Sequence, residues 1–415
     1  MMFDVEQVVQ NFSMCRQKGA YGPLHYLDSA AMAQVPDSVI DAMSGHDGGW
    51  RANVRRGIHR PAEDATQAYE DARLQVARYL GAKDPDEVIF TAGATAGINI
   101  LAWSLGSSLR KGDEILLSVL EHHSNIVPWQ MLSERTGVLV RYLPVDEEGR
   151  LDLTALDACL SERTKLVALT HGSNVSAAIT DVALIAQRAH ECGARVMLDG
   201  AQMAPHGPLD LAALDVDFYV FSSHKVYGPT GAGVLWGRRG CLEGLPPAFG
   251  GGEMIMEVNL EKSSYMGIPH RFEAGTPPVT QAIGLGTALD WVMRQDIDGM
   301  QRHLTGLTDR IMAGLITLDN GSNRIRILGP ALGEERLPLV SFTMEGAHPH
   351  DICQVMSDRH GVALRGGHHC AQPLHTYWGI HGSTRASLAM YNRPSDVDAF
   401  LSGVEDCMNL LCRAV

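Results

Sequence analysis

Between about residue 85 and residue 236, short runs of apolar and β-branched residues alternate with stretches of helical length that are apolar on one face. This alternation is typical of a mainly parallel sheet with helices on both faces, and such sheets bind ligands at the carboxyl ends of their strands. The predicted strands are 87–90, 114–118, 165–169, 195–199, 217–221 and 233–236. The predicted helices between them include 98–107, 124–135 and 182–192.

The pattern changes after about residue 295. A long helical pattern over 299–319 precedes short β-rich segments at 326–328 and 339–342, and helices follow at 350–360 and 394–411. We therefore expect a large domain over 21–295 and a smaller α+β domain over 296–415. The first 20 residues are predicted to form one amphipathic helix and a loop that pack on the smaller domain.

Length and charge limit the classes of function. With 415 residues the chain can bury a large core in two or three domains. Its 34 basic and 48 acidic residues give a net charge of -14, which argues against nucleic acid or an anionic membrane as the main partner. No apolar run approaches the length of a membrane span, and the start, 1–7, carries acid where a secretory signal carries base. These features predict a cytoplasmic enzyme.

Lys225 directly follows the predicted strand 217–221. Burial of a lysine lowers its pKa, and the neutral amine forms a Schiff base with an aldehyde. Ser222 and His224 beside it can bind a phosphate. Loop lysines are more often solvated, so Lys225 taken alone is ambiguous. A lysine with phosphate donors at a strand end nevertheless predicts pyridoxal phosphate as cofactor.

Asp199 and Gln202 follow another predicted strand, 195–199. A buried carboxylate keeps the ring nitrogen of pyridoxal phosphate protonated, which makes the ring an electron sink. A helix N-cap is the alternative role for Asp199. Gln202 is placed to donate a hydrogen bond to the phenolate oxygen of the ring.

Two turns after predicted strands carry further candidate ligands. The turn 93–97 joins backbone N–H groups, the Thr95 hydroxyl and a helix N-terminus into an anion site, although such turns are common. The segment 121–125 places His123 where an imidazole can stack on the cofactor ring and shuttle protons. Histidines in a loop are otherwise usually surface residues.

The segment 364–374 is the most specific signal in the second domain. Cys370 lies beside Arg365 and two histidines, an electropositive setting that favours a thiolate, and adjacent glycines indicate a loop that can move. Arg385 further on is suited to bind a carboxylate through two parallel hydrogen bonds. Zinc is the competing interpretation, but the spacing matches no structural zinc pattern and there is one thiolate, so we predict no metal site. The possible ligands are His368, His369, Cys370, His375 and His381.

The chain resembles the class V aminotransferase superfamily, and within it the Suf-type (group II) cysteine desulfurases. Asp199, Gln202, Lys225, Cys370 and Arg385 occur in the order of that family. The resemblance runs nearly end to end through the segments 27–31, 56–59, 121–130, 173–175, 221–231, 272–277 and 368–374. It implies a fold-type I, pyridoxal phosphate-dependent α/β transferase whose large domain has a mainly parallel, seven-stranded sheet.

The same resemblance implies a role for each candidate residue. Lys225 would hold the cofactor, Asp199 and Gln202 would tune its ring, and His123 would stack on it. Cys370 would accept the sulfur. The phosphate ligands would be Thr95, Ser222 and His224, joined by Thr276 from the second subunit of a homodimer. The substrate contacts would be Asn174, Arg385, Ala30 and Arg365.

The implied reaction converts L-cysteine to L-alanine and leaves a persulfide on Cys370. That sulfur would pass to an acceptor protein, for iron-sulfur clusters or other thio-cofactors, which the sequence does not name. The alternatives are a selenocysteine lyase, a related β-eliminating lyase, and a catalytically silent scaffold for sulfur-transfer partners. Intact Lys225 and Asp199 argue against the scaffold. Arg55, Ala94 and Ala177 depart from the family, which usually has histidine, threonine and glycine there. Ala94 costs at most one hydroxyl at the phosphate, whereas Arg55 and Ala177 bear on substrate preference and partner exchange.

Overall fold

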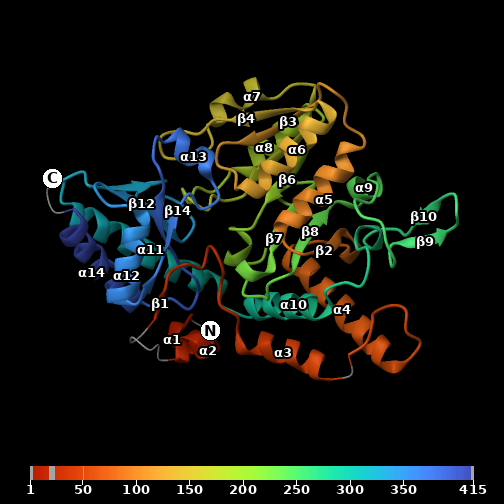
Figure 1. Ribbon diagram of the computed structural model, residues 1–415, viewed down its shortest axis with the longest axis horizontal. Coiled ribbons are helices and arrows are strands. Elements are labelled where there is room, and N and C mark those ends of the chain that lie inside the picture. Colours follow the sequence, from red (N-terminus) through yellow and green to blue (C-terminus); the bar gives the residue numbers. More distant parts are fainter. Residues whose placement is uncertain (1–2, 18–23, 50, 413–415) are drawn as a thin grey trace.

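The structure is a computed structural model that describes residues 3–17, 24–49 and 51–412. In this part of the chain, seven strands form a central sheet in the order β2-β8-β7-β6-β5-β3-β4 (Figure 1). Neighbouring strands are parallel except at β8, which runs antiparallel to β2 and β7. The strands are β2 Val88–Thr91, β3 Glu114–Ser118, β4 Leu139–Leu143, β5 Thr164–Thr170, β6 Arg195–Asp199, β7 Phe218–Ser222 and β8 Gly233–Gly237. The predicted fold class is confirmed.

All six strands predicted for the central sheet are present within two residues of their predicted bounds, as are the β-rich segments 326–328 and 339–342 of the second part. The seventh strand, β4, was not among the predicted ranges because it lies at the edge of the sheet and is largely exposed. An edge strand needs little apolar surface, so its residues do not show the buried run that marks the others.

The two faces of the central sheet belong to two separate apolar clusters. Ile115 and Leu117 of β3 pack in one cluster with α5 (Ala94–Gly106) and α6 (Val127–Thr136). Leu116, between them in the sequence, points to the other cluster. That cluster includes residues of α4 (Arg60–Tyr79), α8 (Val182–Glu191) and α10 (Val279–Met293). The alternation of neighbours along one strand is the reason that helices cover both faces.

A second sheet lies beside the first (Figure 1) and has the order β11-β12-β15-β14, antiparallel throughout. Its strands are β11 Ile325–Leu328, β12 Leu339–Met344, β14 Arg365–Gly367 and β15 Ser383–Ser387. The helices of this part are α11 Ile297–Asp319, α12 Pro349–His360, α13 Gln372–Tyr377 and α14 Pro394–Leu411. The strands that carry Arg365 and Arg385 were not predicted. A short strand near the start of the chain, β1 (His25–Tyr26), pairs with β13 (Val362–Ala363), so this early segment joins the second part.

The N-terminal segment forms two short helices, α1 (Val5–Val9) and α2 (Ser13–Arg16), instead of the single helix predicted. The amide of Asn11 donates to the carbonyls of Gln7 and Val8, which ends α1 there. Phe12 then packs against aromatic rings of both parts of the molecule: Tyr227, Trp291 and Tyr391. Residues 1–2 and 18–20 of the predicted segment lie outside the described residues.

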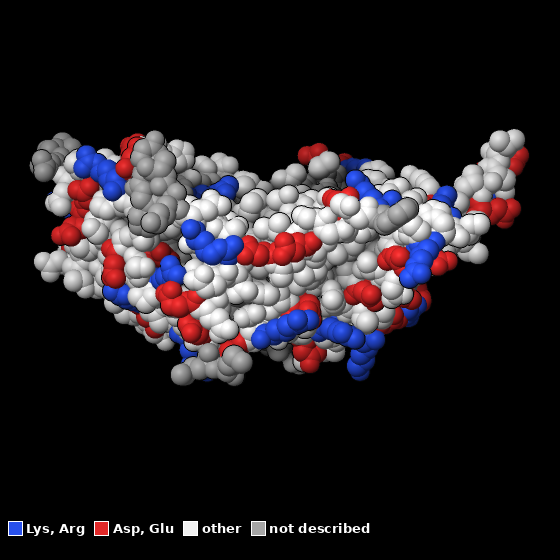
Figure 2. Space-filling model, turned by 90° about the horizontal axis from the view of Figure 1, so that it is seen from below, with Lys and Arg blue, Asp and Glu red and all other residues white. Residues whose placement is uncertain are grey.

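A hairpin of β9 (Ile255–Val258) and β10 (Ser263–Tyr265) follows the glycines 250–252 and projects from the body of the molecule (Figure 1). Leu260 at its tip is fully exposed, as is Ile58 elsewhere on the surface. Figure 2 shows the lower side of the molecule, where a broad area carries no charged side chain. The remaining helices are α3 Asp37–Gly48, α7 Leu156–Cys159 and α9 Arg239–Glu243.

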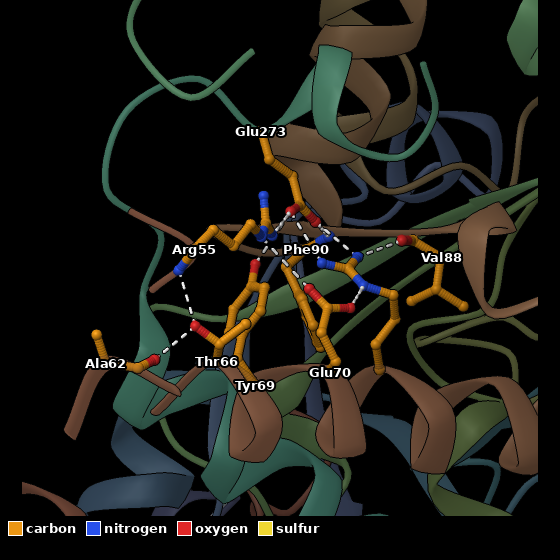
Figure 3. A network of polar contacts seen from close by, with 9 residues as sticks. Arg55, Ala62, Thr66, Tyr69, Glu70, Val88, Phe90 and Glu273 are labelled. Atoms are coloured by element: carbon orange, nitrogen blue, oxygen red, sulfur yellow. Dashed lines mark hydrogen bonds and ion pairs between the residues drawn. The ribbon is translucent and has the colours of Figure 1, made fainter. Parts of the chain in front are cut away.

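A buried ionic network fastens the loop before α10 to strand β2 (Figure 3). The guanidinium of Arg73 donates to both carboxylate oxygens of Glu273, at 2.8 and 2.9 Å, and Glu273 also accepts from the N–H of Phe90. Arg55 adds an ion pair to Glu273 at 3.0 Å. Burial alone would raise the pKa of Glu273, but the two arginines outweigh it and lower the pKa to about 2. Arg55, one of the residues that departs from the expected family pattern, therefore belongs to this network.

Glu273→Ala is expected to lower the free energy of unfolding by about 3–5 kcal/mol, because it removes the buried carboxylate that pairs with Arg73 and Arg55 and leaves them only the more exposed Glu70. Urea unfolding followed by circular dichroism measures the loss. Glu243→Ala is the matched control, since Glu243 pairs with Arg239 on the surface and its removal should change stability little. Equal losses in the two variants would contradict the importance of the buried network.

Candidate active site

A cavity of about 190 Å³ lies at the carboxyl ends of the central strands, where the second sheet meets them. Eleven of the thirteen site residues predicted from the sequence line it. They are Ala30, Thr95, Asn174, Asp199, Gln202, Ser222, His224, Lys225, Arg365, Cys370 and Arg385. The two that do not are His123 and Thr276.

Lys225 reaches the cavity from a short 3-10 helix, Ser223–Lys225, that directly follows β7. Gly228 closes this turn, because a Cβ atom there would lie 2.2 Å from the Ser223 hydroxyl oxygen. Burial lowers the pKa of Lys225 to about 8, against a smaller opposing effect of Asp199. The fold thus produces the readily deprotonated amine that the sequence predicted.

The lowered pKa of Lys225 predicts how fast the cofactor-free protein captures pyridoxal phosphate. The rate should rise with pH and level off above about 8, because the neutral amine is the nucleophile, whereas an ordinary lysine has a pKa of 10.5. Stopped-flow absorbance measures the rate, with N-acetyl-lysine as the reference amine. A rate that climbs in parallel with that of the reference amine would contradict the lowered pKa.

Asp199 is the last residue of β6 and is 4% exposed. Its carboxylate accepts a hydrogen bond of 3.0 Å from the N–H of Ala201. Burial raises its pKa, and Lys225 opposes that change. Turns and a 3-10 helix beginning at Ala204 follow it, so Asp199 does not cap an α-helix. Gln202 lies in the same turn and donates one amide hydrogen to the carbonyl of Ala30, at 2.9 Å.

An anion site forms where the N-terminus of α5 meets the end of β7. The Ser222 hydroxyl accepts from the N–H of Ala94 at 2.9 Å, while Thr95 and His224 line the same end of the cavity. A Cβ atom on Gly233 would lie 2.4 Å from the Cα of Gly93, so this approach of two backbones requires glycine. Hydroxyls at a helix N-terminus fit a phosphate, and with Lys225 and Asp199 the residues present fit pyridoxal phosphate.

The imidazole that lines the cavity is that of His122, whereas His123, to which the sequence assigns the stacking role, is not among the lining residues, and that role stays a prediction. A 3-10 helix begins at His123, and this residue contacts the segment that carries Cys370. There the His123 N–H donates to the carbonyl of Cys370 at 2.7 Å, and its Nε2 accepts from the N–H of Gln372 at 3.1 Å. Burial and then the charge of Lys225 lower the pKa of His122 to about 3, which keeps it neutral.

Cys370 is exposed at the cavity on a strained backbone. His369 and Cys370 have φ angles of 51° and 56°, a left-handed conformation that costs a non-glycine residue about 1–2 kcal/mol. Contacts on both sides hold it: the Asn174 amide donates to the His369 carbonyl at 2.7 Å, and His123 binds the Cys370 carbonyl. Asn174 therefore positions the cysteine segment as well as lining the cavity.

Arg385 lies on β15 with 2% of its surface exposed. It donates to the Asn174 carbonyl at 2.9 Å and pairs with Asp28 at 3.3 Å, and its Nε has no hydrogen-bond partner among the described residues. Burial lowers its pKa to about 10, against the opposing charge of Asp28. Arg385 and Arg365 thus bring two guanidiniums to one cavity, which suits a substrate carboxylate. In the sequence, Asp28 stood out only as a member of one segment that resembles the family, because Arg385, which it contacts, is 357 positions away.

The remaining candidates lie outside the cavity. Thr276 is exposed on the loop after Glu273, so its predicted role in a partner's site stays a prediction. Ala177 is buried with a φ of 67°, a conformation that favours glycine, which is the residue expected there from the resemblance. Nε2 atoms of His369 and His375 both contact the Ser383 hydroxyl. Within residues 3–17, 24–49 and 51–412, no three possible ligands gather as a metal site.

The fold and the site define a pyridoxal phosphate-dependent enzyme of fold type I. The Aminotransferase class-V family model matches residues 25–400, and the chain belongs to that family. It is 44% identical to a probable cysteine desulfurase of Streptomyces coelicolor over 414 residues, 98% of each chain. The solved cysteine desulfurase CsdA of Escherichia coli, in an S-sulfonic acid form, is similar with a TM-score of 0.90 and 37% identity over 99% of this chain and 100% of its own.

The apo cysteine desulfurase of Thermococcus onnurineus is similar in the same way, with a TM-score of 0.91 and 34% identity over 97% of this chain and 98% of its own. The predicted enzyme class, a pyridoxal phosphate-dependent cysteine desulfurase, is confirmed by these relatives. The Suf-type branch and the role of each site residue remain predictions. Among the described helices, none has the length and apolar character that crossing a membrane requires.

Proposed function

We propose that this protein converts L-cysteine to L-alanine and leaves the sulfur as a persulfide on Cys370. The observation that carries the proposal is that Lys225, Cys370 and Arg385 line one cavity, although the sequence separates them by up to 160 positions. The cavity thus joins a base, a sulfur nucleophile and a carboxylate ligand around one substrate. Bound pyridoxal phosphate supplies the electron sink for the charge that develops at the substrate Cα.

The residues divide the work between holding and reacting. Arg385 and Asn174 bind the substrate carboxylate, which fixes the amino acid against Lys225. Lys225 as a neutral amine takes the Cα proton. Asp199 would face the ring nitrogen of the cofactor, and His123 would stack on the ring, with His122 lining the same cavity. Ser222, His224, Thr95 and Gln202 hold the phosphate and the ring oxygen.

Cys370 carries out the transfer of sulfur. Its Sγ attacks the substrate sulfur, the bond from that sulfur to Cβ breaks, and Cβ takes up a proton as the amino acid becomes alanine. The strained but clamped segment holds Sγ toward the cavity, while its exposure leaves the persulfide within reach of an acceptor protein. We infer that selenocysteine could react at the same site, because it presents the same carboxylate and Cα.

We also propose a homodimer in which Thr276 of each subunit completes the phosphate site of the other. The exposed position of Thr276, the fully exposed Ile58 and Leu260, and the uncharged area in Figure 2 support an extended contact between two copies. Within each subunit we keep the predicted division at residue 295, with residues 296–415 as the smaller domain.

Incubation of the loaded protein with L-cysteine tests the reaction. Alanine should form, and mass spectrometry of the protein should find one added sulfur atom on the peptide that contains Cys370. Sulfide, ammonia and pyruvate with no added sulfur on Cys370 would instead establish a β-eliminating lyase.

A further inference from the structure

A row of three cavities leads away from the back of the active site. The active-site cavity shares Ala30, Gln202 and Lys225 with a small cavity of about 20 Å³. The small cavity in turn shares His206 and Pro338 with an outer cavity of about 340 Å³. Lys225 therefore lines the small cavity together with the active-site cavity, and His206 lines it together with the outer cavity.

The outer cavity opens to solvent, because exposed residues such as Thr305, Glu334 and Glu335 form part of its wall. It lies between helix α11 and the loop before β12 and is lined by neither Lys225 nor Cys370. A series of shared lining residues thus links Lys225 to the outer cavity through the small cavity, and Cys370 lines neither of these two cavities.

Most polar side chains of the small cavity already have partners inside the protein. The Ser29 hydroxyl bonds to the hydroxyl of Tyr391, at 2.8 Å, and that of Ser387 accepts from the N–H of Ala30, at 2.9 Å. The Tyr227 hydroxyl accepts from a backbone N–H at 3.4 Å. The Lys225 amine and the His206 imidazole remain as the groups that a small guest in this cavity would contact.

Nδ1 of His206 is buried and has no hydrogen-bond partner among the described residues. Buried polar atoms of this kind are usually satisfied by an ordered water, and a cavity of this size holds about one. Burial lowers the pKa of His206 to about 4, against a smaller opposing effect of the Gln202 backbone near the ring, so the ring is neutral at physiological pH. A neutral imidazole can accept a proton at Nδ1 while it releases another from Nε2.

We propose that His206 and one water molecule carry protons between Lys225 and solvent. The inference rests on the proposed function, in which Lys225 takes the Cα proton of the substrate. The Lys225 ammonium gives a proton to the water, the water gives one to Nδ1 of His206, and Nε2–H releases one into the outer cavity. A transfer in the opposite direction brings a solvent proton to Lys225 and restores the tautomer of the imidazole, so no charge accumulates.

L-Cysteine with deuterium at Cα tests the relay, because Lys225 holds the label until it is returned to the amino acid or exchanged with solvent. Alanine formed by the unchanged protein should have lost most of the label. In His206→Leu and His206→Gln, the fraction of alanine that retains deuterium should be at least about threefold higher. Mass spectrometry of the alanine measures it.

The glutamine variant separates a relay from a structural role. Its amide still bonds a water molecule but does not take up a proton at neutral pH, so only the loss of proton transfer raises the retained label. Thr305→Val, which changes the outer cavity alone, is the matched control and should keep full exchange. Unchanged retention in both His206 variants would overturn the relay while leaving the desulfurase reaction intact. No alanine from the unchanged protein would overturn the proposed function instead.

A crystal structure of the cofactor-free protein provides a second measurement that needs no turnover. It should show an ordered water within hydrogen-bond distance of both the Lys225 amine and Nδ1 of His206. A direct hydrogen bond of Nδ1 to another protein group, with no water in the small cavity, would overturn the proposal.

Discussion

Lys225→Ala is expected to lower the turnover of L-cysteine by at least about 10³-fold, because it removes both the group that binds the cofactor aldehyde and the base that takes the Cα proton. The folded state should persist, since the change removes an amine whose pKa is lowered by burial and therefore relieves a cost of desolvation. Alanine formation measures turnover, and circular dichroism with thermal unfolding measures the fold.

Lys83→Ala is the matched control for this lysine. Lys83 is exposed in a turn before β2, so its removal should leave both turnover and cofactor absorbance unchanged. If Lys225→Ala keeps full activity while the control behaves as expected, Lys225 is not the residue that binds the cofactor.

Cys370→Ser is expected to reduce desulfuration of L-cysteine by at least about 10³-fold and to abolish the persulfide, because a hydroxyl does not attack the substrate sulfur as a thiolate does. Cofactor binding should be retained, since Lys225, Asp199 and the anion site are untouched. The measurements are alanine release and the mass of the cysteine-treated protein. Cofactor absorbance distinguishes a lost nucleophile from a lost site.

Cys159→Ser provides the control, because this half-buried cysteine lies far from the cavity lining and should not affect sulfur transfer. L-Selenocysteine adds a sharper comparison. Selenium leaves without thiolate attack, so Cys370→Ser should lose much more activity on cysteine than on selenocysteine. Formation of a persulfide at the usual rate in Cys370→Ser would show that another residue accepts the sulfur.

The central strands could be predicted from their apolar runs, because a strand that is buried on both faces has apolar residues at successive positions in the sequence. The edge strand β4, the hairpin β9–β10 and the strand of Arg385 were missed. Edge and hairpin strands bury little surface, and Ser383–Ser387 is polar at every position but Ala386 although it is buried. Polar residues in a buried strand are satisfied by neighbours from distant segments, so local pattern does not reveal them.

The assignment of His123 illustrates the same limit within the site. Two adjacent histidines follow β3, and nothing in the sequence says which imidazole faces the cofactor. In the fold, His122 lines the cavity and His123 contacts the Cys370 segment, and the stacking role predicted for His123 stays a prediction. The roles of Asp28 and His206 could not be predicted from the sequence either. Asp28 acts through an arginine on a distant strand, and His206 acts through the space between two cavities.

The sequence by itself determined the chemistry available to this protein: a lysine and an aspartate at neighbouring strand ends, a reactive cysteine, and the family to which their order belongs. Those features are local or follow from the order of residues in the chain, so they can be recognised from the sequence alone. Only the tertiary structure decided which groups act together. It lowers the pKa of Lys225, holds Cys370 through Asn174 and His123, and connects Lys225 to His206. Burial and contact between residues far apart in the chain are properties of the folded state, and for that reason no local pattern contains them.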